Sequence, residues 1–164
     1  MKKIILLPAF CILSFFAKSQ EIKKEGFKIG LGGSLAIPAS NLQYSSVGGG
    51  LDVLALYGIS NKILLSADAG FTTLSGKSFF PSTAIIPIRL GVRYLPIDKL
   101  YLTAKAGLGI YTIIKKSSNY FAYSLGAGYL LSPKFDLGAS FDGYSKQSSP
   151  FGYVAIRLGY TFGK

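Results

Sequence analysis

Bulky hydrophobic residues alternate with small or polar residues over most of the chain, and this period of two is typical of β-strands whose two faces meet different surroundings. Residues 27–37 open the pattern, with one face formed by Phe27, Ile29, Leu31, Gly33, Leu35 and Ile37. Residues 153–162 repeat it, with one face formed by Val154, Ile156, Leu158, Tyr160 and Phe162. The pattern therefore predicts a strand near each end of this region.

Six further segments with this alternation lie in between: Val47–Ser60, Lys62–Thr73, Thr83–Leu95, Leu100–Thr112, Tyr120–Leu131 and Phe135–Tyr144. Each has the length of about 9–11 residues, or slightly more, that a tilted membrane strand needs. Short separators with turn residues (61–62, 96–99 and 132–134) alternate with longer ones (39–46, 74–82, 113–119 and 145–150). We therefore predict an all-β fold over residues 27–162: an eight-stranded antiparallel up-and-down transmembrane β-barrel with short periplasmic turns and long extracellular loops.

Two kinds of eight-stranded barrel fit this pattern, and the composition of the two faces separates them. A water-soluble barrel of the lipocalin type would bury the bulky face and would need solvating side chains on the other face. Here the other face is mostly Gly, Ala, Ser and Thr, which fit the crowded interior of a narrow barrel. The bulky face suits hydrocarbon, because a closed barrel pairs all its backbone polar groups. The faces therefore favour the membrane barrel.

Aromatic residues gather near one end of the predicted strands. With the short turns in the periplasm, one outward set falls near that rim: Phe27, Tyr57, Tyr94, Tyr129, Phe135, Tyr160 and Phe162. Amphipathic rings prefer the headgroup level of a membrane, so we expect these residues to form an aromatic girdle. The β-propensity of Tyr and Phe explains their presence in strands but not their gathering at one end. Candidates for the opposite rim are Phe71, Phe121, Tyr123 and Phe141.

Charged residues within the strands fall on the small-residue face and should point into the lumen. Five are positive and four are negative, and we call them the lumen charge network: Lys28, Asp52, Asp68, Arg89, Arg93, Lys105, Asp136, Asp142 and Arg157. Unpaired charges inside would cost several kcal/mol, so they should pair. The register places Arg89 nearly opposite Lys105, and an acid must relieve this repulsion. It also brings Asp68 close to Arg89 and Asp136 within one diagonal step of Arg157, and we predict both ion pairs.

Two interpretations of the lumen charge network stay open. It is either a packed, salt-bridged filling that stabilises a narrow barrel or the lining of an ion pathway. Eight strands leave little bore, which favours the filled lumen.

The first residues have the layout of a secretory signal peptide. A basic start, Met1 to Lys3, precedes an uncharged apolar run over residues 4–17, and Ala17 and Ser19 are the small residues before a cleavage site at Gln20. A membrane-anchoring helix is the alternative, but the run is shorter than the roughly 20 residues that span a bilayer. We predict a signal peptide over residues 1–19 and a short periplasmic N-terminal segment over residues 20–26.

Composition excludes several classes of function. The chain has no His and a single Cys, so the usual general bases, zinc sites and disulfide frameworks are absent. We predict that the protein is not an enzyme and that it has no cofactor and no metal site. Its net charge is +11, but the basic residues are scattered rather than gathered into a stripe, so we expect no nucleic-acid binding.

The two ends of the predicted barrel resemble a known family. Residues 153–162 (YVAIRLGYTF) resemble the C-terminal targeting signal of outer-membrane barrels, although two residues follow the final aromatic. Residues 30–38 (GLGGSLAIP) resemble the first strand of the generic bacterial outer-membrane β-barrel domain family, whose architecture is that of small OmpA/OmpX-like barrels. The resemblance covers about residues 22–162. It implies a Gram-negative envelope, the cell outer membrane and insertion by the barrel assembly machinery, but no specific activity.

Two functions from different classes remain. One is a structural or interaction barrel with a lumen filled by side chains and ion pairs, and the alternative is a narrow, porin-like passive channel for ions or small solutes. Loop lysines (Lys77, Lys115, Lys116 and Lys146) either contact outer-membrane lipids, including the anionic groups of lipopolysaccharide, or are simply solvated. Loops of this length are short for an extensive binding surface.

Overall fold

The structure is a computed structural model that describes residues 26–42, 44–77, 80–114, 116–146 and 150–162. The signal peptide predicted for residues 1–19 lies outside the described residues, as does the predicted periplasmic segment apart from residue 26. Lys115, one of the loop lysines, also lies outside them.

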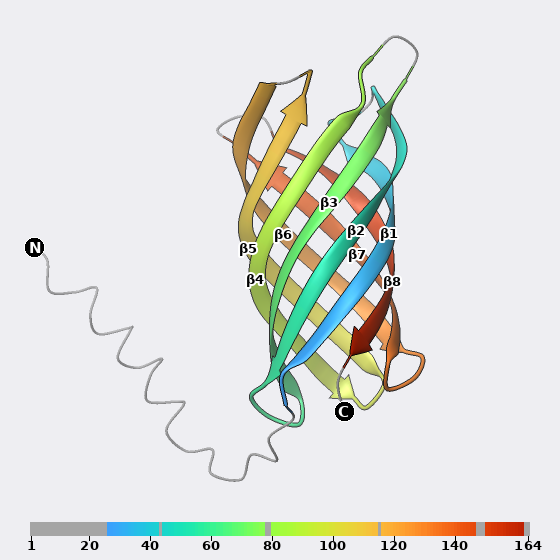
Figure 1. The fold of residues 1–164 in the computed structure, drawn as a ribbon, viewed down its shortest axis with the longest axis vertical. Helices are drawn as coiled ribbons and strands as arrows, with labels where there is room; N and C mark the ends of the chain where they lie inside the picture. Colours follow the sequence, from blue (N-terminus) through green and yellow to red (C-terminus); the bar gives the residue numbers. More distant parts are fainter. Residues whose placement is uncertain (1–25, 43, 78–79, 115, 147–149, 163–164) are drawn as a thin grey trace, which may run out of the picture.

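Eight antiparallel strands form a closed barrel in which every strand pairs with its sequence neighbours and β1 pairs with β8 (Figure 1). The strands are β1 (Lys28–Ser40), β2 (Ser45–Gly58), β3 (Ile63–Gly76), β4 (Thr83–Ile97), β5 (Leu100–Ile113), β6 (Lys116–Leu130), β7 (Phe135–Ser145) and β8 (Phe151–Phe162). A closed sheet leaves no edge strand with unpaired backbone groups. The predicted eight-stranded up-and-down barrel is confirmed. Within the described part of the chain, no helix is long and apolar enough to cross a membrane.

The two ends of the barrel differ in what they carry. The turn end holds the start of β1, the end of β8 and three connections: residues 59–62, 98–99 and 131–134. The loop end holds the other four: residues 41–44, 77–82, 114–115 and 146–150.

Serine side chains stabilise two connections at the turn end. Ser60 Oγ accepts a hydrogen bond from the Ile63 amide at 3.2 Å, and Ser132 Oγ accepts one from the Phe135 amide at 3.1 Å. Such local bonds are the reason that Ser favours turns. The turn positions predicted from residue type therefore have a direct structural cause.

The predicted contrast between short turns and long loops is largely wrong, because the strands run further into the loop end than expected. The largest error lies between β5 and β6, where Ile113 pairs with Lys116 and residues 114–115 alone connect the strands. A two-residue hairpin connection favours positive φ, and Ile114 has a φ of 43°. A β-branched residue rarely adopts this conformation, so the turn had no recognisable sequence signal.

Exposure alternates along the strands as the sequence pattern predicted. In β4, Arg89 is buried, whereas Ile88 and Leu90 on either side of it are 54% and 70% exposed. The outward face therefore presents bulky apolar side chains to the surroundings, as a membrane-embedded barrel requires.

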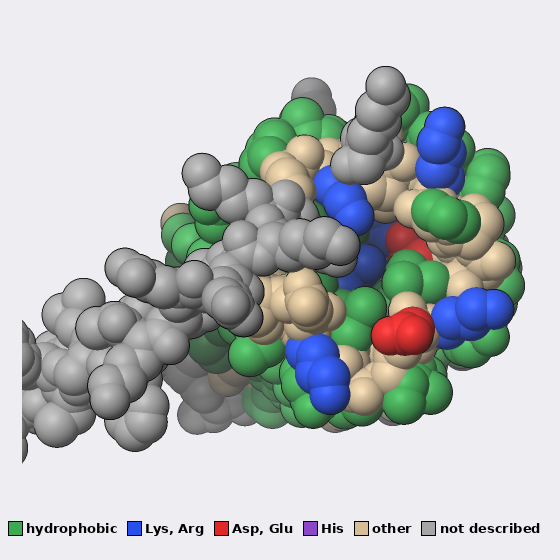
Figure 2. Space-filling view, turned by 90° about the horizontal axis from the view of Figure 1, so that it is seen from below, with side chains coloured by type: hydrophobic (Ala, Val, Ile, Leu, Met, Phe, Trp, Pro, Cys, Tyr) green, Lys and Arg blue, Asp and Glu red, His purple; other side chains and the backbone are tan. Residues whose placement is uncertain are grey.

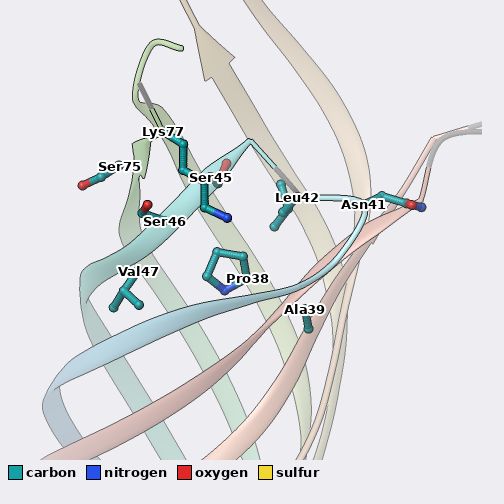
Figure 3. A pocket seen from close by; sticks show the side chains of 9 residues that line it. All are labelled: Pro38, Ala39, Asn41, Leu42, Ser45, Ser46, Val47, Ser75 and Lys77. Atoms are coloured by element: carbon teal, nitrogen blue, oxygen red, sulfur yellow. The ribbon is translucent and has the colours of Figure 1, made fainter. Parts of the chain in front are cut away.

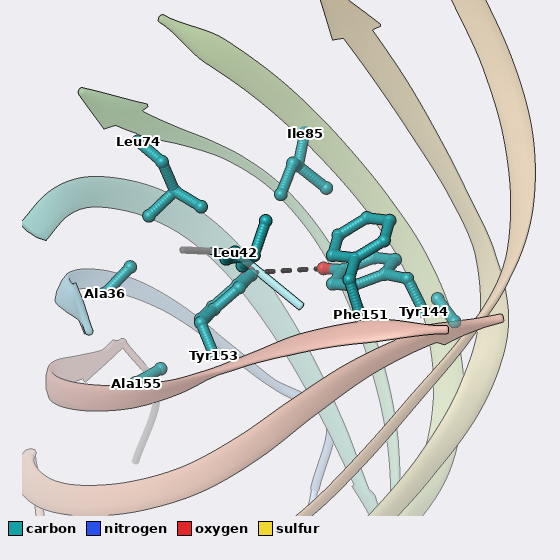
Figure 4. Close-up of a cluster of buried hydrophobic side chains, with 9 residues drawn as sticks. Ala36, Leu42, Leu74, Ile85, Tyr144, Phe151, Tyr153 and Ala155 are labelled. Atoms are coloured by element: carbon teal, nitrogen blue, oxygen red, sulfur yellow. Dashed lines mark hydrogen bonds between the residues drawn. The ribbon is translucent and has the colours of Figure 1, made fainter. Parts of the chain in front are cut away.

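The inward face is not made of small residues throughout, and this corrects the expectation from the sequence. Large side chains fill the lumen near the loop end (Figure 4), where they form the loop-end cluster: Ala36, Leu42, Leu74, Ile85, Ala122, Tyr144, Phe151, Tyr153 and Ala155. Near the turn end, Leu54, Leu56 and Leu64 form a smaller turn-end cluster with Leu95 packed against it. Apolar side chains thus lie above and below the charged middle of the lumen.

Glycine positions make room for the largest of these side chains. A Cβ atom at Gly109 would lie 2.6 Å from the ring of Tyr144, and one at Gly138 would lie 2.6 Å from the hydroxyl of Tyr101. Glycines of the inward face therefore serve to admit rings from neighbouring strands rather than to leave the lumen open.

Candidate functional site

The middle of the lumen holds two groups of ion pairs, and the first is centred on Arg89. Its Nη2 lies 2.7 Å from Asp68 Oδ2 and its Nη1 lies 2.9 Å from Asp142 Oδ2. Lys105 Nζ also contacts Asp68, at 3.2 Å. Asp142 Oδ1 accepts hydrogen bonds from the hydroxyls of Ser124 and Ser140. We call Asp68, Arg89, Lys105 and Asp142 the Arg89 group.

The second group is centred on Arg157. Its Nη2 lies 2.7 Å from Asp52 Oδ2 and its Nη1 lies 3.1 Å from Asp136 Oδ1. The hydroxyl of Tyr101 donates a hydrogen bond of 2.7 Å to the same oxygen of Asp136. Arg93 stacks on Tyr101, with its guanidinium carbon 3.9 Å from the centre of the ring. We call these residues the Arg157 group: Asp52, Arg93, Tyr101, Asp136 and Arg157.

Both ion pairs predicted from the register are present. Asp68 and Arg89 lie directly opposite each other on β3 and β4. Asp136 and Arg157 lie one diagonal step apart on β7 and β8. The sequence also predicted an acid between Arg89 and Lys105 to relieve their repulsion, and Asp68 contacts both of them.

The sequence reasoning missed two ion pairs. Asp52 and Arg157 lie on strands β2 and β8, which both flank β1, so closure of the barrel is what brings them together. A signal for this pair existed, because a closed meander places its first and last strands side by side. The contact of Arg89 with Asp142 crosses the lumen from β4 to β7, and no pairing of neighbouring strands predicts it.

Lys28 and Arg93 complete the predicted set but form no ion pair among the described residues. Lys28 lies at the first position of β1, on the inward face at the rim of the turn end. Arg93 is buried beside the turn-end cluster and contacts the ring of Tyr101. All four carboxylates of the lumen charge network therefore form their ion pairs with Arg89, Lys105 or Arg157.

Little free space remains between the charged side chains. One cavity of about 40 Å³ adjoins both groups, and another of about 30 Å³ lies between Arg93 and Ser124. A single water molecule needs about 10–15 Å³ measured in this way, so each cavity holds very few small molecules. Within the described ranges, no cluster of His, Cys, Asp and Glu is suited to hold a metal ion. The arrangement can neutralise charge and hold water or a small ion.

The aromatic residues predicted for a girdle lie at the strand ends next to the turn end, and six of the seven are exposed: Phe27, Tyr57, Tyr94, Tyr129, Phe135 and Phe162. Tyr160 is half-buried because its ring packs edge-on between neighbours, 4.9 Å from Phe135 and 4.8 Å from Phe162. The rings of this set belong to strands all around the barrel.

The loop end carries a polar pocket of about 690 Å³ between the ends of β1, β2 and β3 (Figure 3). Its polar side chains are Asn41, Ser45, Ser46, Ser75 and Lys77. Asn41 Nδ2 donates a hydrogen bond of 2.7 Å to the backbone oxygen of Pro150, which ties the β1–β2 connection to the segment before β8. The described lining includes hydroxyl, amide and amine groups but no carboxylate.

A closed eight-stranded barrel with a bulky apolar exterior and a charged, filled interior defines the class of small transmembrane β-barrels. The family model described as the outer membrane protein beta-barrel domain matches residues 5–162, and the chain belongs to this family. The protein is thus an integral protein of the outer membrane. A comparison with curated proteins found no matching sequence.

Solved structures of small outer-membrane barrels are similar to this fold. Neisserial surface protein A has 18% sequence identity and a TM-score of 0.61, and the match covers 84% of this chain and 96% of that one. Ail, the attachment invasion locus protein of Yersinia pestis, has 17% identity and a TM-score of 0.59, with 84% and 99% covered. The β-barrel domain of Pseudomonas aeruginosa OprF has 12% identity and a TM-score of 0.55, with 82% and 97% covered. At these identities the likeness concerns the fold alone.

Proposed function

We propose that this outer-membrane barrel has a structural or interaction role and neither conducts solutes nor catalyses a reaction. The observation that supports this role is the closure of the lumen at the loop end. Tyr144 and Tyr153 in the loop-end cluster are at most 1% exposed, and their hydroxyls lie 3.1 Å apart (Figure 4). Phe151 stacks on Tyr144 with ring centres 5.0 Å apart. A conducting path would have to displace these rings.

The ion pairs below the loop-end cluster support the same role. A permeating ion would have to separate Arg89 from Asp68 and Asp142, all of them buried. Removing one partner from such a pair costs about 3–5 kcal/mol. The lumen charge network is therefore proposed as a stabilising filling rather than an ion pathway.

Conductance in a planar bilayer tests this role. Fluorescently labelled protein confirms insertion, and the inserted wild-type barrel should give no stable open steps. The narrow passive channel is supported instead if wild-type steps appear and their size changes in Arg89→Gln or Lys105→Gln. Lys28→Gln serves as the control, because Lys28 lies at the rim and outside both groups.

The aromatic residues at the turn end form a girdle at the periplasmic membrane interface, and the loop end faces outward from the cell. Amphipathic rings favour the headgroup level, and the girdle set lies at one level next to the turn end. Single cysteines test this orientation in intact cells with a membrane-impermeant maleimide. Lys146→Cys at the loop end should label and Asp98→Cys at the turn end should not; the reverse result contradicts the orientation.

The loop end contacts lipopolysaccharide. Lys77, Lys116 and Lys146 are exposed at this end, and the polar pocket adds hydroxyl donors that suit sugars and phosphates. Among the similar structures, Ail was solved in complex with the heparin analogue sucrose octasulfate. Polyanionic sugars are therefore the ligand chemistry that this proposal assigns to the loop end.

Binding of nanodisc-embedded protein to lipopolysaccharide tests this contact. The pair Lys116→Gln and Lys146→Gln should weaken binding, whereas the matched pair Lys62→Gln and Lys134→Gln at the turn end should not. If both pairs of substitutions weakened binding equally, the binding would reflect net charge alone, and a specific contact at the loop end would be contradicted.

The route to the membrane follows from the N-terminal sequence. Residues 1–19 act as a signal peptide, residues 20–26 remain in the periplasm, and the barrel assembly machinery inserts residues 27–162. N-terminal sequencing of protein purified from membranes should begin at Gln20, and an intact Met1 would contradict cleavage. Depletion of the assembly machinery should leave the chain in the periplasm.

A further inference from the structure

Arg93 is the one buried cation of the lumen charge network that has no carboxylate within ion-pair distance among the described residues. Arg93 is 6% exposed, and its guanidinium lies over the ring of Tyr101. Its Nε is buried and finds no acceptor among the described protein groups. A buried charge in this situation is costly unless a further group satisfies it.

A cavity of about 30 Å³ lies beside Arg93, and its described polar lining is made of basic and hydroxyl side chains. The lining includes three basic side chains and four hydroxyl side chains: Arg93, Tyr101, Thr103, Lys105, Ser124, Ser140 and Arg157. Thr103 Oγ1 is buried and, like Arg93 Nε, has no hydrogen-bond partner among the described groups. No acidic side chain belongs to the described lining. Two residues with an unpaired polar atom, Arg93 and Thr103, thus line the same small cavity as the basic side chains of Lys105 and Arg157.

The charge balance of the lumen also favours an anion in this cavity. The Arg89 group is neutral, with two cations and two carboxylates. The Arg157 group is also neutral, with the cations Arg93 and Arg157 and two carboxylates, both of which contact Arg157. Lys28 at the same end of the lumen adds one positive charge and has no ion pair with any of the described residues. One monovalent anion beside Arg93 would therefore bring the inward-facing charges to zero.

We infer that the cavity beside Arg93 is a binding site for one small monatomic anion, with chloride as the physiological ligand. Its volume is about two to three times the 10–15 Å³ that a water molecule needs, which suits a halide but not a polyatomic oxyanion. Arg93 Nε and the hydroxyl of Thr103 would donate to the ion, and Lys105 and Arg157 would add positive potential. The site does not depend on the structural role proposed above.

The turn end offers positive charge to an approaching anion. Seen from this end, most of the charged side chains around the rim are basic, and charged side chains of both signs are visible deeper in the mouth of the barrel (Figure 2). Such a field raises the local concentration of small anions. The proposed ligand would thus come from the periplasmic side.

Anomalous diffraction from protein refolded and crystallised in sodium bromide without chloride tests the site directly. Bromide replaces chloride at such sites and scatters anomalously at its absorption edge. We expect an anomalous peak in contact with Arg93 Nε and Thr103 Oγ1. Density in the cavity without an anomalous signal means that water fills it, and this result overturns the proposal.

Thermal unfolding of the full mature chain in detergent micelles provides a second measurement. Replacing chloride with gluconate, an anion too large for the cavity, at fixed ionic strength should lower the wild-type Tm by about 3 °C. The difference should vanish in Arg93→Met and shrink in Thr103→Val, which keeps the volume and removes the hydroxyl. It should persist in the matched control Lys28→Met, which removes the same charge outside the cavity. An equal response in every variant would be a general salt effect and would overturn the site.

Discussion

Arg157 on β8 donates hydrogen bonds of 2.9 and 2.7 Å from Nε and Nη2 to Asp52 on β2, 105 residues earlier in the chain, and does so across the backbone of β1. Gly32 on β1 lies opposite Asp52 and has no side chain in the way. A Cβ atom there would collide with the guanidinium of Arg157. The ion pair thus joins the first strands of the barrel to the last at the place where the sheet closes.

Gly32→Ala should destabilise the barrel although the change adds one methyl group. The guanidinium of Arg157 must move, and it can do so only by leaving Asp52 or Asp136. We expect a loss of about 1–3 kcal/mol in the free energy of unfolding, measured by urea titration in lipid vesicles. Gly33→Ala is the control: its Cβ would meet nothing closer than 3.9 Å, so it should be neutral or slightly stabilising. Equal effects of both changes would contradict the close approach at Gly32.

Arg157→Met should destabilise the barrel more than Asp52→Asn. Loss of the guanidinium leaves two carboxylates without their cation, whereas Asp52→Asn leaves Arg157 paired with Asp136. We expect about 2 kcal/mol or more for Arg157→Met in the same unfolding assay. In the Arg157→Met background the effect of Asp52→Asn should fall by at least about 0.5 kcal/mol. Additive effects would mean that the pair is not coupled, and Asp98→Asn in an exposed turn should change nothing.

Leu90→Lys should be far more costly than Ile97→Lys in a bilayer, although both side chains are exposed. Leu90 is 70% exposed at the middle of β4 and Ile97 is 63% exposed at its turn-end terminus. A lysine facing lipid costs about 2–4 kcal/mol at the midplane and about 0–1 kcal/mol near the interface. Unfolding from lipid vesicles measures both values. Equal, small effects would mean that this face meets water.

Tyr144 in the loop-end cluster should be sensitive to loss of its ring and tolerant of loss of its hydroxyl. Tyr144→Phe keeps the stacking on Phe151 and gives up the hydrogen bond to Tyr153, which is worth about 1 kcal/mol. Tyr144→Ala leaves a cavity and should cost about 3–5 kcal/mol. Urea unfolding distinguishes the two. A loss for Tyr144→Ala no larger than that for Tyr144→Phe would show that the ring does not hold the cluster together.

The alternation of side chains determined the fold class, the number of strands and the faces of the barrel. A strand turns its side chains to opposite sides at each residue, so the inward position of Arg89 and the outward position of Leu90 follow from local sequence. Pairing across one hairpin follows as well, because a turn fixes the register of the two strands it joins. Asp68 and Arg89 were therefore predictable as neighbours.

Tertiary structure decided everything that depends on closure and curvature. Closing the sheet across β1 brings Arg157 to Asp52, and the narrow bore brings Arg89 on β4 to Asp142 on β7. The same closure gathers the large inward side chains near the loop end into one cluster. It also leaves Arg93 beside a cavity whose described polar lining is basic and hydroxyl side chains rather than carboxylates. These contacts join residues far apart in the chain, and their geometry is set by how the strands wrap around the lumen, which no local pattern records.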